Sequence, residues 1–301
     1  MTVHDSGKRD LSSDELTRAV LASFAGAGDD RFREIAEGLV RHLHDFVTDV
    51  RLTEEEWFNA VDFLTRTGQI SNDKRQEFVL LSDVLGVSML VIGLAHPRTG
   101  GATESTVFGP FFVEGSPAIE NGGDLAAGAP GKPCFMQGRV LSTTGEPIPS
   151  ASIEVWQADE DGFYDVQLPE LDQLRGRGHL SPAADGRFWF WSVLPEAYPI
   201  PDDGPVGELL TAAGRGPMRP AHIHFMVKAP GYETLITHVF VDGDEYLDRD
   251  AVFGVKSSLI APFDRREPGT APDGRVVDTP YYTMSYDLVL AAAGKSKGGE
   301  A

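Results

Sequence analysis

The chain has 301 residues, 41% hydrophobic and 24% charged, which are proportions typical of folded globular proteins. Its formal net charge of -20 would repel a phosphate backbone, so we expect no nucleic acid partner. The single cysteine, Cys134, excludes an intrachain disulfide, and the polar N-terminus lacks the apolar core of a signal peptide, so we expect a cytoplasmic protein. The most apolar stretch, residues 84–95, is too short to span a bilayer.

The first hundred residues have the periodicity of amphipathic helices. Ser12 precedes acidic residues and an apolar stripe at helical spacing, and a second stripe covers residues 32–43. Thr53, followed by three glutamates, marks the start of a third helix. We expect a fourth helix over residues 72–96. It is apolar on nearly all sides past Val84, so that protein or lipid must cover it.

The hydrophobic period changes after residues 97–103, a stretch that contains proline and glycine. We interpret it as a boundary between a helical domain at residues 1–102 and a second domain at residues 103–301. Short segments rich in β-branched and aromatic residues follow, separated by Gly and Pro, and they predict an antiparallel β-sandwich. The fold class is therefore mainly β with α. The expected strands are residues 135–141, 151–158, 187–193, 221–229, 235–241 and 282–290.

Two histidines, His222 and His224, are separated by one residue on one of these strands. Residues two apart on a strand point to the same face, so both imidazoles can reach one point while Ile223 faces the opposite side. Alone, this pattern is a weak signal and favours two ordinary packed histidines over a metal site. Arg219 lies just upstream, where its fixed positive charge would face an anionic ligand.

Two tyrosines lie in loops of unusual sequence, Tyr164 in DGFYD and Tyr198 in PEAYPIP. Each by itself favours a half-buried packed tyrosine whose hydroxyl is hydrogen-bonded. A phenol has a free pKa of about 10 and needs a strongly Lewis-acidic ion to ionise at neutral pH. Iron(III) meets this need, whereas zinc and Fe(II) oxygenase sites usually use other ligands. The predicted site for one Fe(3+) ion per subunit consists of Tyr164, Tyr198, His222 and His224.

The stretches DGFYD, PEAYPIP and RPAHIHF, with GPFF at residues 109–112, resemble the intradiol ring-cleaving dioxygenases, the catechol 1,2-dioxygenase superfamily. The match covers nearly the whole chain. It implies the same four iron ligands, with Tyr198 leaving the metal to act as a base and Arg219 stabilising negative charge that develops on the substrate. The resemblance also implies a homodimer formed through the N-terminal helices, with an apolar tunnel that can hold a phospholipid.

Within the family, residues 103–117 and 237–256 are most similar to the branch that acts on hydroxyquinol (1,2,4-trihydroxybenzene). His238 stands where catechol enzymes usually have Gln, and its role stays open. Asp83 stands where they have a small or apolar residue, and it could accept a hydrogen bond from a third ring hydroxyl.

The implied reaction uses O2 to cleave the ring between the two adjacent hydroxylated carbons, in aromatic compound degradation. The product is 3-hydroxy-cis,cis-muconate, which tautomerises to maleylacetate, and no organic cofactor is needed. Two alternatives remain: a catechol or chlorocatechol 1,2-dioxygenase, and a non-catalytic β-sandwich module with an accidental histidine pair.

The resemblance further implies a substrate pocket with apolar walls and a few polar groups. Leu80 and Asp83 lie three residues apart on an expected helix, so both can face one cleft. The expected lining residues are Leu80, Asp83, Val107, Phe108, Gly109, Pro110, Phe111, Ile200, Pro201, Arg219 and Val252.

Overall fold

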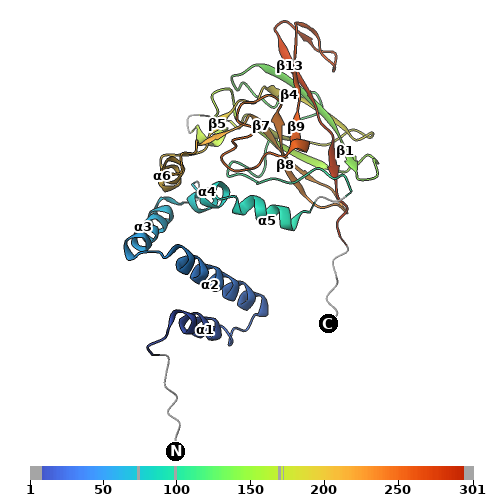
Figure 1. Cartoon of the computed structure of the whole chain (residues 1–301). Helices are drawn as coiled ribbons and strands as arrows, with labels where there is room; N and C mark the ends of the chain where they lie inside the picture. Colours follow the sequence, from blue (N-terminus) through green and yellow to red (C-terminus); the bar gives the residue numbers. More distant parts are fainter. Residues whose placement is uncertain (1–8, 73–74, 98–99, 169–170, 172, 295–301) are drawn as a thin grey trace, which may run out of the picture. The chain divides into compact units, whose positions relative to one another are not determined.

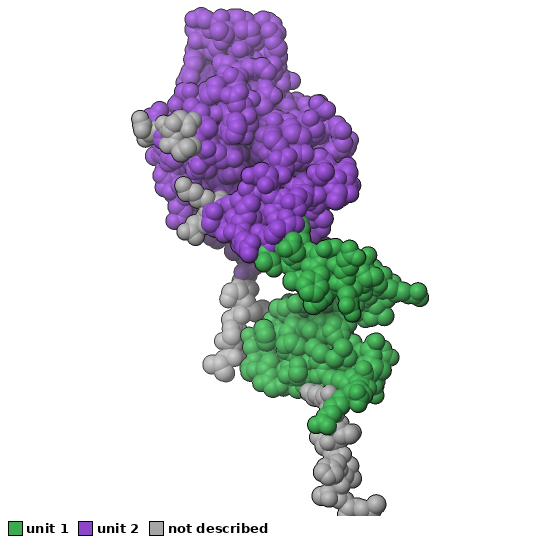
Figure 2. All heavy atoms as spheres, turned by 90° about the vertical axis from the view of Figure 1, so that its left-hand side faces the viewer, with its two compact units in different colours: residues 1–65 green, residues 66–301 purple. Residues whose placement is uncertain are grey.

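The computed structural model describes residues 9–72, 75–97, 100–168, 171 and 173–294. The chain forms two compact units, Met1–Thr65 and Arg66–Ala301 (Figure 2). The last two helices before residue 97 therefore belong to the same unit as the strands. The domain boundary expected after residue 102 stays a prediction.

The first unit is helical and contains α1 (Ser13–Ser23), α2 (Asp30–Val50) and most of α3 (Glu54–Ile70). The start of α3 is fixed as predicted, because Thr53 Oγ1 accepts the Glu56 N–H at 3.2 Å while the Glu56 carboxylate accepts the Thr53 N–H at 2.8 Å. An apolar stripe along α2 remains exposed within the chain. Its members are Phe32, Ile35, Leu39, Leu43, Phe46, Val47 and Val50.

The single helix expected over residues 72–96 is wrong. The structure has two short helices, α4 (Glu77–Val84) and α5 (Val87–Ala95), bent by 78° relative to each other. The break falls at Gly86, whose φ of 73° is a left-handed conformation that glycine adopts without steric cost. Within the described ranges, which exclude residues 73–74, no single helix is long and apolar enough to cross a membrane, and only this bent pair satisfies the length and composition criteria together.

The second unit contains two five-stranded sheets (Figure 1). One sheet has the order β3-β2-β7-β8-β9, and in the other β1 pairs with β4, β13 and β14, while β10 pairs with β13. The strands of the first sheet are β2 (Ser152–Trp156), β3 (Arg177–Leu180), β7 (His222–Lys228), β8 (Leu235–Val241) and β9 (Ile260–Ala261). The strands of the second are β1 (Pro133–Ser142), β4 (Arg187–Val193), β10 (Phe263–Arg266), β13 (Tyr281–Ser285) and β14 (Leu288–Leu290).

The expected fold class, a β-rich domain preceded by helices, is confirmed. Two strands, β4 and β8, have the predicted bounds, and the strand expected over residues 282–290 is divided into β13 and β14. Most strand pairs are antiparallel as predicted, but β13 and β14 both run parallel to β1, and β9 runs parallel to β8. The remaining elements are short: β5 (Tyr198–Pro199), α6 (Pro205–Ala212), β6 (Met218–Arg219), β11 (Gly269–Thr270), β12 (Val276–Val277), and 3-10 turns at Asp165–Gln167 and Ser257–Leu259.

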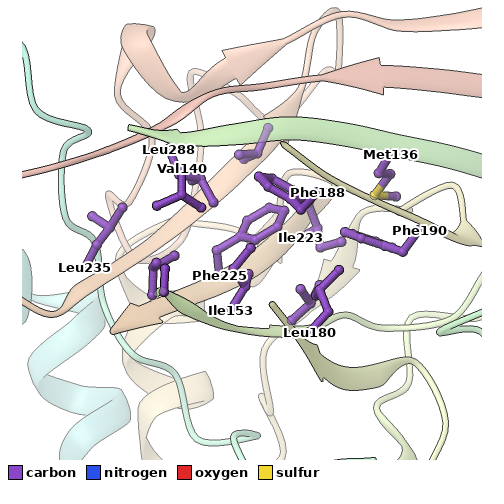
Figure 3. Packing of buried hydrophobic residues seen from close by; sticks show 14 of the residues in the cluster. Met136, Val140, Ile153, Leu180, Phe188, Phe190, Ile223, Phe225, Leu235 and Leu288 are labelled. Carbon is purple, nitrogen blue, oxygen red and sulfur yellow. The ribbon is translucent and has the colours of Figure 1, made fainter. Parts of the chain in front are cut away.

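The hydrophobic core lies between the two sheets (Figure 3). Phe188 and Phe190 of β4 and Met136 of β1 point from one sheet toward Ile223 and Phe225 of β7 in the other. The same alternation that buries Ile223 and Phe225 places the side chains on either side of Ile223 on the opposite face of β7. That face carries the candidate site.

Candidate metal centre and substrate cavity

The two histidines are the first and third residues of β7, which lies between β2 and β8 in the sheet. His224 lies opposite Trp156 of β2 and His238 of β8 in the strand register. The Trp156 indole stacks on the His224 ring at a centroid distance of 4.6 Å and an interplanar angle of 18°. Because β7 is flanked by hydrogen-bonded neighbours, both imidazoles are held at fixed positions, and both are buried.

The two tyrosines reach the same place from loops. Tyr164 precedes a 3-10 turn, and its N–H donates to the side-chain oxygen of Gln167 at 2.9 Å. Tyr198 lies in β5, where it pairs with Arg219 of β6. Gly162 allows these loops to approach closely, because a Cβ at its φ of 83° would lie 2.7 Å from Cβ of Tyr198.

Four side-chain atoms converge on one point. The Tyr164 hydroxyl lies 2.9 Å from Nε2 of His224 and 3.1 Å from the Tyr198 hydroxyl. The Tyr198 hydroxyl in turn lies 3.4 Å from Nε2 of His222. The sequence prediction named these four residues, and the structure brings all four together.

The chemistry of the donors fits a strongly Lewis-acidic metal. His222 donates its Nδ1 proton to the Pro220 carbonyl oxygen at 2.7 Å, which leaves the Nε2 lone pair for a metal. Burial and then the nearby Arg219 charge lower the pKa of His222 to about 3, so the imidazole is neutral. Burial raises the pKa of Tyr164 well above its usual value, and the adjacent Tyr198 adds to this effect. A phenolate therefore forms here only beside a cation such as iron(III).

A third histidine, His238, borders the four donors. Ligand nitrogens of His222, His224 and His238 all lie within 4.8 Å of one another. The His238 Nδ1 lies 2.9 Å from the Thr106 hydroxyl, whereas its Nε2 is buried and has no hydrogen-bond partner among the described residues. The tyrosine hydroxyls lie 2.9 and 3.4 Å from Nε2 of His224 and of His222, so they join these two histidines in one donor set.

A buried ion pair lies beside the four donors. Nη1 of Arg219 is 3.3 Å from Nε2 of His222, and its Nε donates to Oδ1 of Asp250 at 3.1 Å. Both side chains are almost completely buried. Sequence reasoning identified Arg219 but missed Asp250, because the two residues lie 31 positions apart and no local pattern indicates their pairing.

A cavity of about 610 Å³ opens beside this cluster and is lined by both Tyr198 and Arg219. All the expected lining residues border it except Phe108, whose ring packs on Phe112 at 4.8 Å and on Trp156 at 5.8 Å instead. Asp83 is among the lining residues and is buried, and this burial raises the pKa of its carboxyl group. Further lining residues that the sequence did not reveal are Arg75, Gln76, Glu77, Val79, Phe112, Val113, Val166 and Gln167.

Comparison with known proteins identifies the family. The family model described as Dioxygenase matches residues 107–292, and that described as Catechol dioxygenase N terminus matches residues 29–103. The chain is 52% identical to a hydroxyquinol 1,2-dioxygenase of Nocardioides simplex, over 97% of this chain and 100% of the relative. It is 55% identical to a 6-chlorohydroxyquinol 1,2-dioxygenase of Cupriavidus pinatubonensis, over 91% and 96% of the two chains.

A solved structure gives the same result. The crystal structure of hydroxyquinol 1,2-dioxygenase from Pseudomonas putida DLL-E4 superposes with a TM-score of 0.88 at 46% identity, covering 93% of this chain and 99% of that one. Sequence similarity, structural similarity and the donor set at the centre therefore agree. The chain belongs to the intradiol dioxygenases, a family of enzymes that depend on non-haem iron(III).

Proposed function

We propose that the enzyme cleaves hydroxyquinol with O2 between its two adjacent hydroxylated carbons, giving 3-hydroxy-cis,cis-muconate and, after tautomerisation, maleylacetate. The observation that carries this proposal is Asp83, a buried carboxylate in the wall of a cavity that is otherwise mainly apolar. A third ring hydroxyl can donate a further hydrogen bond to this carboxylate, whose burial raises its pKa, whereas a ring with only two hydroxyls makes no such bond. The identity of more than 50% to relatives named for hydroxyquinols supports the same substrate.

One Fe(3+) ion per subunit would be held by Tyr164, Tyr198, His222 and His224. When bound, the ion supplies a Lewis acid that favours loss of protons from the substrate hydroxyls and activates the ring toward oxygen. Tyr164 is fully buried and stacks on Phe111 at 4.4 Å, so we assign it as the permanent ligand. Tyr198 borders the cavity, so its phenolate would be in place to accept a substrate proton.

The cavity would orient the substrate ring through contacts at opposite ends of the ring. The adjacent hydroxyls face the metal ligands, and the third hydroxyl donates a hydrogen bond to Asp83. Arg219, next to Tyr198 in the β5–β6 pair, places a positive charge where negative charge develops on the substrate. Val107, Ile200 and Val252 supply apolar walls that exclude water.

Oxygen uptake tests the substrate assignment directly. Iron-loaded enzyme should consume one O2 per hydroxyquinol and yield maleylacetate, with a higher kcat/KM for hydroxyquinol than for catechol or chlorocatechol. Mass spectrometry with 18O2 should find both oxygen atoms in the product. A higher kcat/KM for catechol would favour the alternative catechol 1,2-dioxygenase activity.

Removal of the phenolate of Tyr164 tests the ligand assignment. The iron-loaded protein should be burgundy because of charge transfer from tyrosinate to iron(III). Tyr164→Phe should lose most of this absorption and lower kcat by more than about 100-fold, since a charged ligand is removed. Tyr281→Phe, at another buried tyrosine outside the cavity, is the matched control and should keep colour, iron content and rate.

The same proposal includes a homodimer formed through the N-terminal helices. The exposed apolar stripe of α2 supports it, because contiguous exposed apolar surface of this kind usually marks an interface. A cavity of about 420 Å³ between helices of the first unit, lined by Leu16, Val47 and Trp57 among others, supports the binding of a phospholipid chain. Mass spectrometry of lipid extracted from the purified protein would test that part.

A further inference from the structure

The guanidinium of Arg219 is held on one side by a single carboxylate. Its Nε donates to Oδ1 of Asp250 at 3.1 Å, and its Nη2 lies 3.4 Å from Oδ2 of the same residue. This fork leaves the Nη1 edge free of Asp250, and Nη1 lies 3.3 Å from Nε2 of His222. The plane of the guanidinium is therefore set by Asp250, while its opposite edge faces the metal-binding atoms.

Asp250 is itself fixed by the backbone of the turn that it begins. Its Oδ2 accepts the Gly254 N–H at 2.8 Å, and its Oδ1 lies 3.3 Å from the Val252 N–H. Between them, Phe253 has a φ of 57°, a left-handed conformation uncommon for a bulky residue. Gly254 lets the pair fit, because a Cβ there would lie 3.1 Å from both Nη2 of Arg219 and Oδ2 of Asp250.

A second arginine, Arg215, braces the backbone around the pair. Arg215 donates to the Ala251 carbonyl at 2.9 Å and to the Val84 carbonyl at 2.7 Å, and its guanidinium lies 4.7 Å from the centre of the Phe253 ring. The turn at residues 250–254 is thus tied to the end of α4, which carries Asp83. Such bracing keeps the Asp250 carboxylate in one place relative to the cavity.

We propose that Asp250 is a positioning residue for ring cleavage, which holds the Arg219 guanidinium with its Nη1 edge toward the reacting part of the substrate. This inference rests on the proposed function. It goes beyond a structural ion pair because the geometry assigns Asp250 only two of the guanidinium's three nitrogens. The free edge lies where charge develops during the reaction, so a small rotation of the guanidinium would remove its stabilising effect.

Asp250→Asn separates positioning from folding. The amide oxygen of Asn can still accept one N–H bond. Its NH2 group, however, would face N–H donors of the guanidinium or of the turn, so the two-point contact with Arg219 is lost. In single-turnover experiments, hydroxyquinol should bind anaerobically with nearly unchanged affinity. The step that follows addition of O2 should slow by about 100-fold, as expected for a misplaced electrostatic group.

Spectroscopy and two further variants serve as controls for the rate measured with Asp250→Asn. Iron content and the tyrosinate absorption of the resting enzyme should match wild type, because neither Tyr164 nor Tyr198 bonds to Asp250. Arg219→Lys should show the same signature of intact binding and a slow oxygen step. Glu245→Gln, which removes an exposed carboxylate paired with Arg249 nearby in the chain, should behave as wild type.

The proposal is overturned if Asp250→Asn reacts with O2 at the wild-type rate. It is also overturned if this variant loses iron or tyrosinate absorption while Arg219→Lys keeps both, since Asp250 would then serve the fold rather than the guanidinium. Should Asp250→Asn not fold, Asp250→Glu keeps the charge but moves the carboxylate by one methylene, and a wild-type oxygen step in that variant contradicts the inference. Failure of the proposed function differs visibly, because the wild-type enzyme itself would then consume no O2 with hydroxyquinol.

Discussion

Asp83 places a buried carboxyl group in the mainly apolar wall of the cavity. Burial raises the pKa of its carboxyl group, whereas a hydrogen bond from Ser88 and the Arg219 charge act in the opposite direction. A hydrogen-bond donor on the substrate would, like Ser88 and Arg219, lower this pKa. Asp83 is therefore suited to recognise a hydroxyl that catechol lacks.

Asp83→Asn should lower kcat/KM for hydroxyquinol by about 10- to 100-fold, because a hydrogen bond to a charged acceptor is replaced by one to a neutral amide. The value for catechol should change by less than about 3-fold, since catechol has no hydroxyl that reaches this position. Steady-state oxygen uptake with both substrates measures the ratio. Asp203→Asn, at an exposed partner of the cavity residue Arg75, is the control. Equal losses for both substrates would contradict the role of Asp83 in selectivity.

The individual site residues differ in how well the sequence could reveal them. The convergence of His222 and His224 follows from the two-residue period of a strand, which is a local property. Prediction of the two tyrosines as ligands required ligand chemistry and a family resemblance, because the sequence of a loop does not determine where a side chain points. Asp250 was missed because its pairing with Arg219 depends on how distant segments fold together.

At the scale of elements, the central strand β1 determines how closely its neighbours can pack. Gly138 lies in the middle of β1, and a Cβ at this position would lie 1.8 Å from the carbonyl oxygen of Tyr286. The backbone between β13 and β14 thus runs in direct contact with β1 at Gly138. No larger residue fits without moving this segment.

Gly138→Ala should lower the free energy of unfolding by about 3 kcal/mol, because the clash is with backbone that cannot rotate away. Urea denaturation followed by tryptophan fluorescence measures the loss. The control is Gly216→Ala, where the added methyl group meets nothing within 4 Å and no positive φ opposes it, and it should change stability by less than about 0.5 kcal/mol. Equal stability of the two variants would contradict this close contact at Gly138.

Long helices and strands could be predicted from their hydrophobic period, whereas short elements could not. The helix expected over residues 72–96 was drawn through Gly86, because the surrounding run is apolar throughout and periodicity cannot detect a bend there. Helix α6 was not expected, although Pro205 at its first position is a start signal, because its eight residues are too few for a clear period. The parallel pairing of β13 with β1 has no local signature, since pattern alone does not give strand direction.

At the scale of the whole molecule, the isolated chain leaves the apolar stripe of α2 uncovered. Its seven exposed apolar residues recur at helical spacing along 21 residues, whereas an ordinary surface helix turns such a stripe toward its own core. A second copy of the chain would cover it. This is the basis for expecting a dimer.

Leu43→Lys should shift the protein from dimer toward the monomer mass of 32.6 kDa, because a charge would be buried at the centre of the stripe. Size-exclusion chromatography with light scattering over a range of protein concentrations measures the shift. Asp49→Lys introduces the same side chain at a polar position of α2 and should leave the mass unchanged. A monomeric wild-type protein would rule out the expected interface.

The parallel pairing of β1 with β13 and β14 has a consequence for synthesis of the chain. Residues 143–280 lie between the end of β1 and the start of β13, and a ribosome adding about 5–20 residues per second needs roughly 7–28 seconds to make them. The sheet that carries His222 and His224 ends at Ala261, so all its strands emerge earlier. From the end of β9 until β13 and β14 have been made, the apolar face of this sheet lacks two of the strands that close the opposite sheet. Newly made chains are therefore open to chaperones, or to aggregation, until the last strands emerge.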